Sequence, residues 1–153
     1  MTPKKSRGRP ALTTDDYARL AAFRHAMRAF LHFSDEAMAE VGLTGRHYQA
    51  LLILRARPAG DAVTINDLAQ LLFLKHNSTV GLVDRLAEGG LVVRKPSRTD
   101  RRKVELRLTE RGSRLLVRLA DRHHEELQRI GPELERFFHD LSAGAPQRDD
   151  AGG

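Results

Sequence analysis

A short stretch between two apolar segments is dense in positive charge. Residues 95–103 contain five cations within nine positions: Lys95, Arg98, Arg101, Arg102 and Lys103. Cations on a turn between strands can bind the phosphates of a nucleic acid or enter its minor groove. Asp100 stands two residues before Arg102, where its carboxylate can hold that guanidinium in one pose. The stretch therefore indicates either an interface for an anionic partner or a solvated, charged turn.

A second candidate group lies on the segment 77–88, whose apolar spacing predicts a helix. At 100° per residue, one side is apolar and carries Val80, Val83, Leu86 and Ala87. The other side is small and polar and carries Asn77, Ser78, Gly81 and Arg85. A glycine inside a helix costs about 1 kcal/mol relative to alanine, a cost that close approach to base edges would explain. The alternative is an ordinary solvent-facing side.

Helices must place these two groups next to each other. Thr13 with Asp16, and Thr64 with Asp67, fit the capping box that opens a helix. The first helix is expected to end near Phe33, and a second is expected from residue 44 until shortly before residue 58. A short third helix follows residue 64, and two glycines end the fourth at 89–90.

The period of the apolar residues changes after this fourth helix. Residues 91–94 and 104–108 predict two strands joined by the basic loop, and Thr109 is expected to cap a long helix. Gly131-Pro132 is expected to interrupt that helix before a final short one that contains Leu141. Two short helices followed by a hairpin with a basic tip predict a winged helix-turn-helix, a mainly α fold with a small β-hairpin (α+β).

Composition narrows the possible functions. The chain has 153 residues, a length typical of one domain, and its net charge of +6 and isoelectric point near 10.3 favour a polyanionic partner. It has no cysteine, which excludes disulfides, thiolate metal sites and cysteine-based redox sensing. No apolar run approaches the roughly 20 residues of a membrane-spanning helix, and the basic N-terminus leads into no signal segment. We therefore expect a cytoplasmic protein.

Both ends of the chain are polar. Residues 1–11 predict a disordered basic arm, residues 12–143 a single domain, and residues 144–153 a disordered tail. Within the arm, Arg7-Gly8-Arg9-Pro10 looks like the core of an AT-hook, which binds narrow A·T minor grooves. The alternative is an arm that adds only unspecific attraction to phosphates.

Several motifs together resemble the MarR family of bacterial transcriptional regulators. They are DLA at 67–69, VGLVDRL at 80–86, GLVVR at 90–94, DRR at 100–102 and LRLTERG at 106–112. The resemblance extends over about residues 15–142. It implies a homodimer held by terminal helices at about 14–33 and 109–143, with a DNA-binding lobe at about 58–109.

The resemblance also implies a function. Most members are repressors that bind pseudo-palindromic operators, and many release DNA when a small aromatic or phenolic ligand binds. By resemblance, Arg102 enters the minor groove, Asp100 orients it, and residues His76, Asn77, Ser78 and Thr79 face the major groove. We expect Lys75 and Arg85 to bind phosphates, since such contacts position a protein without reading bases.

A ligand site is expected near the first two helices. Arg28, His32 and also His25 share a face of the first helix, and Arg46 and Tyr48 open the second. Our hypothesis is that Arg46, with Arg28, His32 and Tyr48, binds an aromatic carboxylate, since arginine pairs with the carboxylate and an apolar wall takes the ring. The alternative is a solvated face on the first helix and core packing of Tyr48.

Other classes of function find little support. We see no glycine-rich phosphate loop and no nucleophile with an adjacent base, so we expect no enzyme and no cofactor. His123 and His124 are adjacent and point about 100° apart on a helix, which disfavours a shared metal. Two rivals stay open: an architectural DNA-binding protein without sequence preference, and a winged-helix module that binds proteins. A steep decline of binding with salt would separate DNA binding from the second rival.

Overall fold

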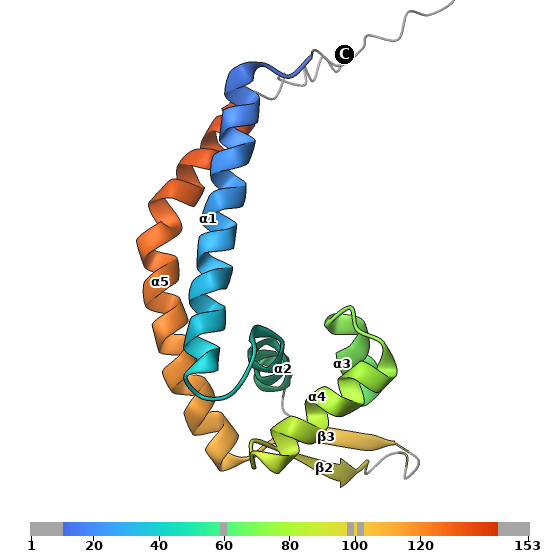
Figure 1. The fold of residues 1–153 in the computed structure, drawn as a ribbon. Coiled ribbons are helices and arrows are strands. Elements are labelled where there is room, and N and C mark those ends of the chain that lie inside the picture. Colours follow the sequence, from blue (N-terminus) through green and yellow to red (C-terminus); the bar gives the residue numbers. More distant parts are fainter. Residues whose placement is uncertain (1–10, 59–60, 98–99, 101–102, 144–153) are drawn as a thin grey trace, which may run out of the picture.

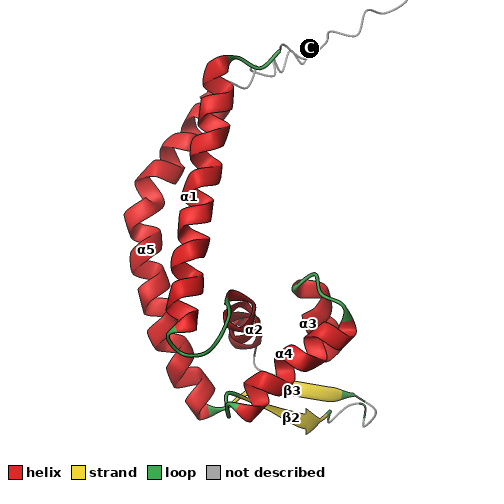
Figure 2. Ribbon diagram, in the orientation of Figure 1, coloured by secondary structure: helices red, strands yellow, loops and turns green. Residues whose placement is uncertain are grey.

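The computed structural model describes residues 11–58, 61–97, 100 and 103–143. Two long helices lie side by side, α1 (Thr14–Ala39) and α5 (Glu110–Ala143), and a smaller lobe extends from one end of this pair (Figure 1). The lobe contains α2 (Gly45–Ala56), β1 (Val63–Thr64), α3 (Ile65–Leu71), α4 (His76–Glu88), β2 (Val92–Pro96) and β3 (Val104–Leu108). Figure 2 shows how far helix predominates over strand, which confirms the predicted mainly α fold with a small sheet.

Two of the helices begin with the predicted capping boxes. The Thr13 backbone N–H donates to Asp16 Oδ2 at 2.8 Å, and the Asp16 N–H donates to Thr13 Oγ1 at 3.2 Å. Thr64 and Asp67 repeat the pattern at the start of α3, at 2.9 and 3.2 Å. The hydrogen bonds from Thr64 hold the pKa of the Asp67 carboxyl below its usual range. Both boundaries were therefore readable from the sequence.

Helix α1 is longer than predicted. It continues past Phe33 to Ala39 because Ser34, Ala37 and Met38 are buried at helical spacing. The polar pair at 35–36 lies within this extension and is exposed. The prediction of an end near Phe33 is wrong, and the extra turns connect α1 to the core of the lobe.

The sheet is antiparallel, in the order β1-β3-β2. The predicted hairpin is confirmed, with Val92 paired to Leu108 and Pro96 to Val104. β1 adds a third strand that was not predicted, with Val63 opposite Leu106. A strand of two residues is too short to show an alternating pattern.

One core holds the lobe to the long helices. Met38, Leu51, Leu68 and Leu86, from α1, α2, α3 and α4, are fully buried in a single cluster. That cluster also includes residues of the sheet and Leu116 of α5. The end of α1 and the start of α5 are therefore packed against the helices that carry the candidate interface.

Helix α5 passes through Gly131-Pro132 without ending, so the predicted interruption is wrong. Proline removes one helical hydrogen bond and strains the preceding turn. Packing against α1 holds the segment beyond it in place, since Phe137 stacks on Phe23 with ring centroids 4.4 Å apart. α5 curves back toward α1 in this region (Figure 1).

Candidate nucleic-acid interface

A tight turn joins α3 to α4. The Leu74 N–H donates to the Ala69 carbonyl at 2.9 Å and the Phe73 N–H to the Gln70 carbonyl at 3.2 Å. This is the pattern of a Schellman motif, whose central residue takes a left-handed conformation usually reserved for glycine. Here that residue is Phe73, with φ of 53° and a side chain that is 95% exposed. The turn fixes where α4 begins.

Helix α4 divides into a buried and an exposed side. Thr79, Leu82, Val83 and Leu86 are buried, at the spacing of one helical face. The exposed residues of α4 include His76, Asn77, Ser78, Gly81 and Arg85. No atom lies within 4 Å of the position that a Cβ on Gly81 would occupy, so this part of the helix is open to a partner.

Thr79 departs from the expectation. It was expected to face a groove together with His76, Asn77 and Ser78, but its side chain is fully buried. Its Oγ1 donates to the Lys75 carbonyl at 3.1 Å, which satisfies the hydroxyl inside the protein. Thr79 is therefore a core residue and is removed from the set of groove-facing residues.

The first residue of α4 has a partner that sequence reasoning missed. His76 Nδ1 donates to the Asn66 side-chain oxygen of α3, 2.7 Å away. Asn66 is exposed, and its spacing of ten residues from His76 carries no sequence signal. This bond holds the imidazole at the exposed start of α4, beside the exposed Lys75.

The hairpin is anchored to α4. Arg94 of β2 donates to Asp84 Oδ1 at 2.6 Å. At the base of the loop, the Ser97 N–H donates to the Lys103 carbonyl and the Lys103 N–H to the Asp100 carbonyl, both at 2.9 Å. Lys95 and Lys103 are exposed. Arg98, Arg101 and Arg102 lie outside the described residues, so their expected roles stay predictions.

These features share one side of the lobe. The turn before α4, the first residues of α4 and the loop end of the hairpin all lie away from the α1–α5 pair (Figure 1). A helix that presents small polar side chains fits the major groove, and a basic loop beside it can reach the backbone or the minor groove. The arrangement can therefore bind duplex DNA with the start of α4 and the hairpin together.

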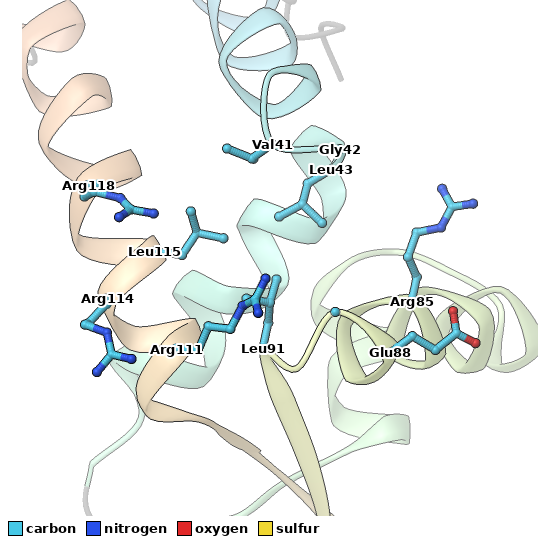
Figure 3. Close-up of a pocket in the computed structure, with 11 residues that line it drawn as sticks. Val41, Gly42, Leu43, Arg85, Glu88, Leu91, Arg111, Arg114, Leu115 and Arg118 are labelled. Atoms are coloured by element: carbon cyan, nitrogen blue, oxygen red, sulfur yellow. The ribbon is translucent and has the colours of Figure 1, made fainter.

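The residues expected to form a ligand site do not come together within the chain. Arg28, His32 and Arg46 are exposed, and His32 Nε2 lies 3.4 Å from Glu36. Tyr48 is buried and stacks on His123 with ring centroids 4.1 Å apart. Sequence reasoning missed an open cavity of about 570 Å³ between the loop after α1, the end of α4 and the start of α5 (Figure 3). Its lining includes Arg111, Arg114 and Arg118, which lie one and two turns apart on α5.

The described part of the chain offers no site for a metal ion: no three histidine, aspartate or glutamate side chains are grouped as ligands there. Its helices are also too short or too polar to span a lipid bilayer.

Comparisons with known proteins point in one direction. A family model described as MarR family matches residues 41–103. PecS, a transcriptional regulator of Dickeya dadantii, is 30% identical over 91 residues, 60% of this chain and 55% of PecS. A candidate transcriptional regulatory protein for the hcr operon of Thauera aromatica is 30% identical over 127 residues, 76% of this chain and 74% of that protein. The chain spans about half the length of PecS and of YfiV from Bacillus subtilis. These relatives are regulators rather than enzymes, as expected for this chain.

Solved structures share the fold. The repressor CouR, bound to a 23-mer DNA duplex, has a TM-score of 0.63 at 26% identity, over 88% of this chain and 97% of CouR. MepR, a transcription regulator of a multidrug efflux pump of Staphylococcus aureus, has a TM-score of 0.71 at 22% identity, over 83% of this chain and 94% of MepR. The second likeness concerns the fold alone, and both confirm the winged helix.

Proposed function

The chain belongs to the MarR family of DNA-binding transcriptional regulators, and from this premise we propose that it acts in the cytoplasm as a homodimeric repressor. The dimer binds a pseudo-palindromic operator and leaves it when a small molecule binds. One observation carries the proposal: the exposed, small and polar start of α4 lies on the same side of the lobe as the ends of β2 and β3 that the basic stretch joins.

The DNA contacts divide by chemistry. His76, Asn77 and Ser78 reach base edges in the major groove, and the bare backbone at Gly81 permits close approach. Lys75 and Arg85 bind phosphates, which position the protein without reading the sequence.

The loop of the hairpin supplies the remaining contacts. Arg102 enters the minor groove with Asp100 as its orienting carboxylate, and Arg98 and Arg101 bind the adjacent backbone. CouR, which shares the fold at 26% identity, is bound to a DNA duplex in its solved structure, and this supports duplex DNA as the partner of the present chain.

The long helices form the dimer. Leu20, Met27 and Leu31 of α1 and Leu127 and Phe138 of α5 are large apolar side chains that are exposed in the single chain. Apolar surface of this kind is typical of a face that a partner covers. A second copy of the chain covers it and places two copies of α4 at the two halves of an inverted repeat.

The effector is a small aromatic acid or a phenol. Its binding changes the relation between the long helices and the lobe and so lowers the affinity for the operator. Two other functions remain as outcomes of the test: an architectural protein that coats DNA, and a winged-helix module that binds proteins.

An operator search tests the proposal. The purified protein is incubated with random duplex DNA, bound DNA is selected and sequenced, and the selection is repeated with Arg102→Ala and with Arg129→Ala as a cation control remote from the lobe. We expect one inverted repeat with half-sites about one helical turn apart, lost or degraded only in Arg102→Ala. Binding that declines steeply with salt but enriches no sequence identifies an architectural protein, and no binding identifies a protein-binding module.

A further inference from the structure

The two nitrogens of the exposed His76 imidazole have different surroundings. Nδ1 lies 2.7 Å from the side-chain oxygen of Asn66, on the neighbouring helix α3. Nε2 lies on the other side of the ring, and in the described part of the chain it has no hydrogen bond or ion pair. The ring therefore uses one nitrogen to join α4 to α3 and leaves the other for a partner.

This contact determines which nitrogen carries the hydrogen of the uncharged ring. The oxygen of a side-chain amide accepts hydrogen bonds and never donates them, so the bond between Asn66 and His76 requires the hydrogen on Nδ1. Nε2 then has no hydrogen and only accepts a hydrogen bond. The partner of one ring nitrogen thus decides what the other nitrogen offers.

The space beside the pair is open. A hollow of about 430 Å³ lies between the start of α3, the first residue of α4 and the start of β3, and both Asn66 and His76 line it. The lining also contains Asp67 and Lys103. The Asp67 carboxylate is held by the N–H and the hydroxyl of Thr64, at 2.9 and 2.7 Å, whereas Lys103 is an exposed cation that can bind a phosphate. A DNA strand can therefore approach the ring beside a cation.

We propose that Asn66 determines which bases His76 reads. The inference rests on the proposed function, in which His76 reaches base edges in the major groove. An Nε2 that only accepts can pair with the exocyclic amine of adenine or cytosine. The exposed groups of guanine and thymine, N7 and O6 or O4, are themselves acceptors and give it no hydrogen. Asn66 is thus a positioning residue that acts through His76, and α3 contributes to base reading without touching a base.

Loss of the Asn66 oxygen should relax this preference. In Asn66→Ala the uncharged ring can carry its hydrogen on either nitrogen, so Nε2 can donate as well as accept. Guanine and thymine then become suitable partners beside adenine and cytosine. Since one neutral hydrogen bond changes an equilibrium constant about three- to tenfold, we expect the preference for adenine or cytosine at this position to decrease by about that factor.

Nitrogen-15 NMR of the full chain without DNA tests the first step. The spectra are recorded at pH about 8, above the usual histidine pKa of about 6.5, and His76→Gln assigns the signals. In the natural chain, Nδ1 of His76 should show a bonded hydrogen and Nε2 should show none. Asn66→Ala should shift both signals toward a mixture of the two tautomers. Gln70→Ala, which removes another exposed amide of α3, is the matched control and should leave both signals unchanged.

Selection from random duplex DNA at the same pH tests the second step. His76→Ala identifies the position that His76 reads, because that position loses its preference. The natural chain and Gln70→Ala should enrich adenine or cytosine there, and Asn66→Ala should enrich them less. The double variant should enrich the same sequences as His76→Ala alone, because Asn66 acts only through His76. Melting temperatures establish that each variant is folded.

Several outcomes would overturn the inference. In the NMR spectra these are a bare Nδ1 in the natural chain, or unchanged His76 signals in Asn66→Ala. In the selection they are a sequence in which no position depends on His76, guanine or thymine at its position, or an unchanged preference in Asn66→Ala. A further effect of Asn66→Ala in the His76→Ala background would mean that Asn66 itself contacts DNA, which also contradicts the inference.

The same selection separates this inference from the proposed function. If the natural chain enriches no inverted repeat, the proposed function fails and the role of Asn66 fails with it. If the repeat is enriched but its preference at the His76 position does not depend on Asn66, the proposed function stands and only this inference is overturned.

Discussion

The imidazole of His123 stacks on the phenol of Tyr48, with ring centroids 4.1 Å apart, deep in the joint between α5 and α2. Its Nδ1 donates to the Leu119 carbonyl at 2.6 Å, and its Nε2 lies 2.9 Å from Ser34 Oγ of α1. The bond to Leu119 lies within α5 and fixes the ring, so this buried histidine joins α5 to α1 through one hydrogen bond and to α2 through the ring contact. Since the lobe meets the long helices here, the group contributes to holding the two parts in one arrangement.

Removing the Ser34 hydroxyl should weaken this joint. In Ser34→Ala the buried Nε2 of His123 loses its partner, and an unsatisfied buried polar group costs about 1–3 kcal/mol. We expect the free energy of unfolding, measured with urea, to decrease by this amount. The control is Ser113→Ala, because Ser113 is a half-buried serine in the same helix as His123. This substitution should change the free energy of unfolding by less.

A double-mutant cycle separates the pair from its surroundings. Ser34→Ala combined with His123→Phe removes both polar partners and should destabilise the protein by less than the sum of the single changes. Strict additivity would mean that the Ser34–His123 bond contributes nothing to stability.

His47 should make the stability depend on pH. Burial, with a further effect of Arg85, lowers the pKa of His47 in the folded chain. The unfolded chain, with a histidine pKa of about 6.5, therefore takes up the proton first as the pH decreases. The contribution of His47 to the free energy of unfolding is therefore constant above the unfolded-state pKa. It decreases as the pH falls from there toward the folded-state pKa, and it levels off at lower pH.

His47→Gln tests this dependence, because glutamine at the third position of a helix can also accept the Thr44 N–H. We expect a smaller loss of unfolding free energy between pH 7 and pH 5 in His47→Gln than in the natural chain, measured by denaturant titration. The exposed His139→Gln serves as control. Parallel pH profiles for all three proteins would contradict the prediction.

Local signals in the sequence predicted most of the fold. The pairs Thr13–Asp16 and Thr64–Asp67 each contain both halves of a capping box, so the helix starts were predictable from four residues alone. The hairpin was predictable because Val104, Leu106 and Leu108 alternate with charged residues. These signals act within one element, which is why one sequence reveals them.

The errors concern features that depend on other elements. The resemblance placed Thr79 among the groove-facing residues, and no local pattern shows that its hydroxyl bonds to the Lys75 carbonyl inside the core. A proline inside a helix usually kinks or ends it, but α5 continues past Pro132 because Phe137 packs on Phe23 of the neighbouring helix α1. The cavity near Arg111 and Arg118 is also lined by the loop after α1, which is about 70 residues away in the sequence. A local sequence pattern cannot show that these two segments lie next to each other.

Gly112 should tolerate no side chain. A Cβ at this position would lie 2.1 Å from the Leu91 carbonyl oxygen, and backbone cannot yield as a flexible side chain can. Thr109 fixes the same contact, since its N–H donates to the Leu91 carbonyl at 3.0 Å. Gly112→Ala should therefore destabilise the chain by about 1–3 kcal/mol or more, measured by thermal unfolding.

Gly131→Ala is the matched control in the same helix. Nothing lies within 4 Å of its Cβ position, so alanine should stabilise α5 there by about 0.5–1 kcal/mol. Opposite signs for the two substitutions are the expected result. A stability gain in both would mean that the contact between Gly112 and Leu91 is looser than the structure has it.

Phe73 should be replaceable by glycine with a gain in stability. The left-handed conformation costs an L-residue roughly 1–2 kcal/mol, and glycine avoids this cost while losing more backbone entropy on folding, about 0.5–1 kcal/mol. Because the ring is 95% exposed, little packing is lost with it. We expect Phe73→Gly to raise the unfolding free energy by up to about 1 kcal/mol, whereas Phe73→Ala, which keeps the backbone cost, should leave it nearly unchanged. Chemical denaturation of the three proteins measures both effects. Equal stability of the glycine and alanine variants would show that the turn relaxes and that α4 does not begin under strain.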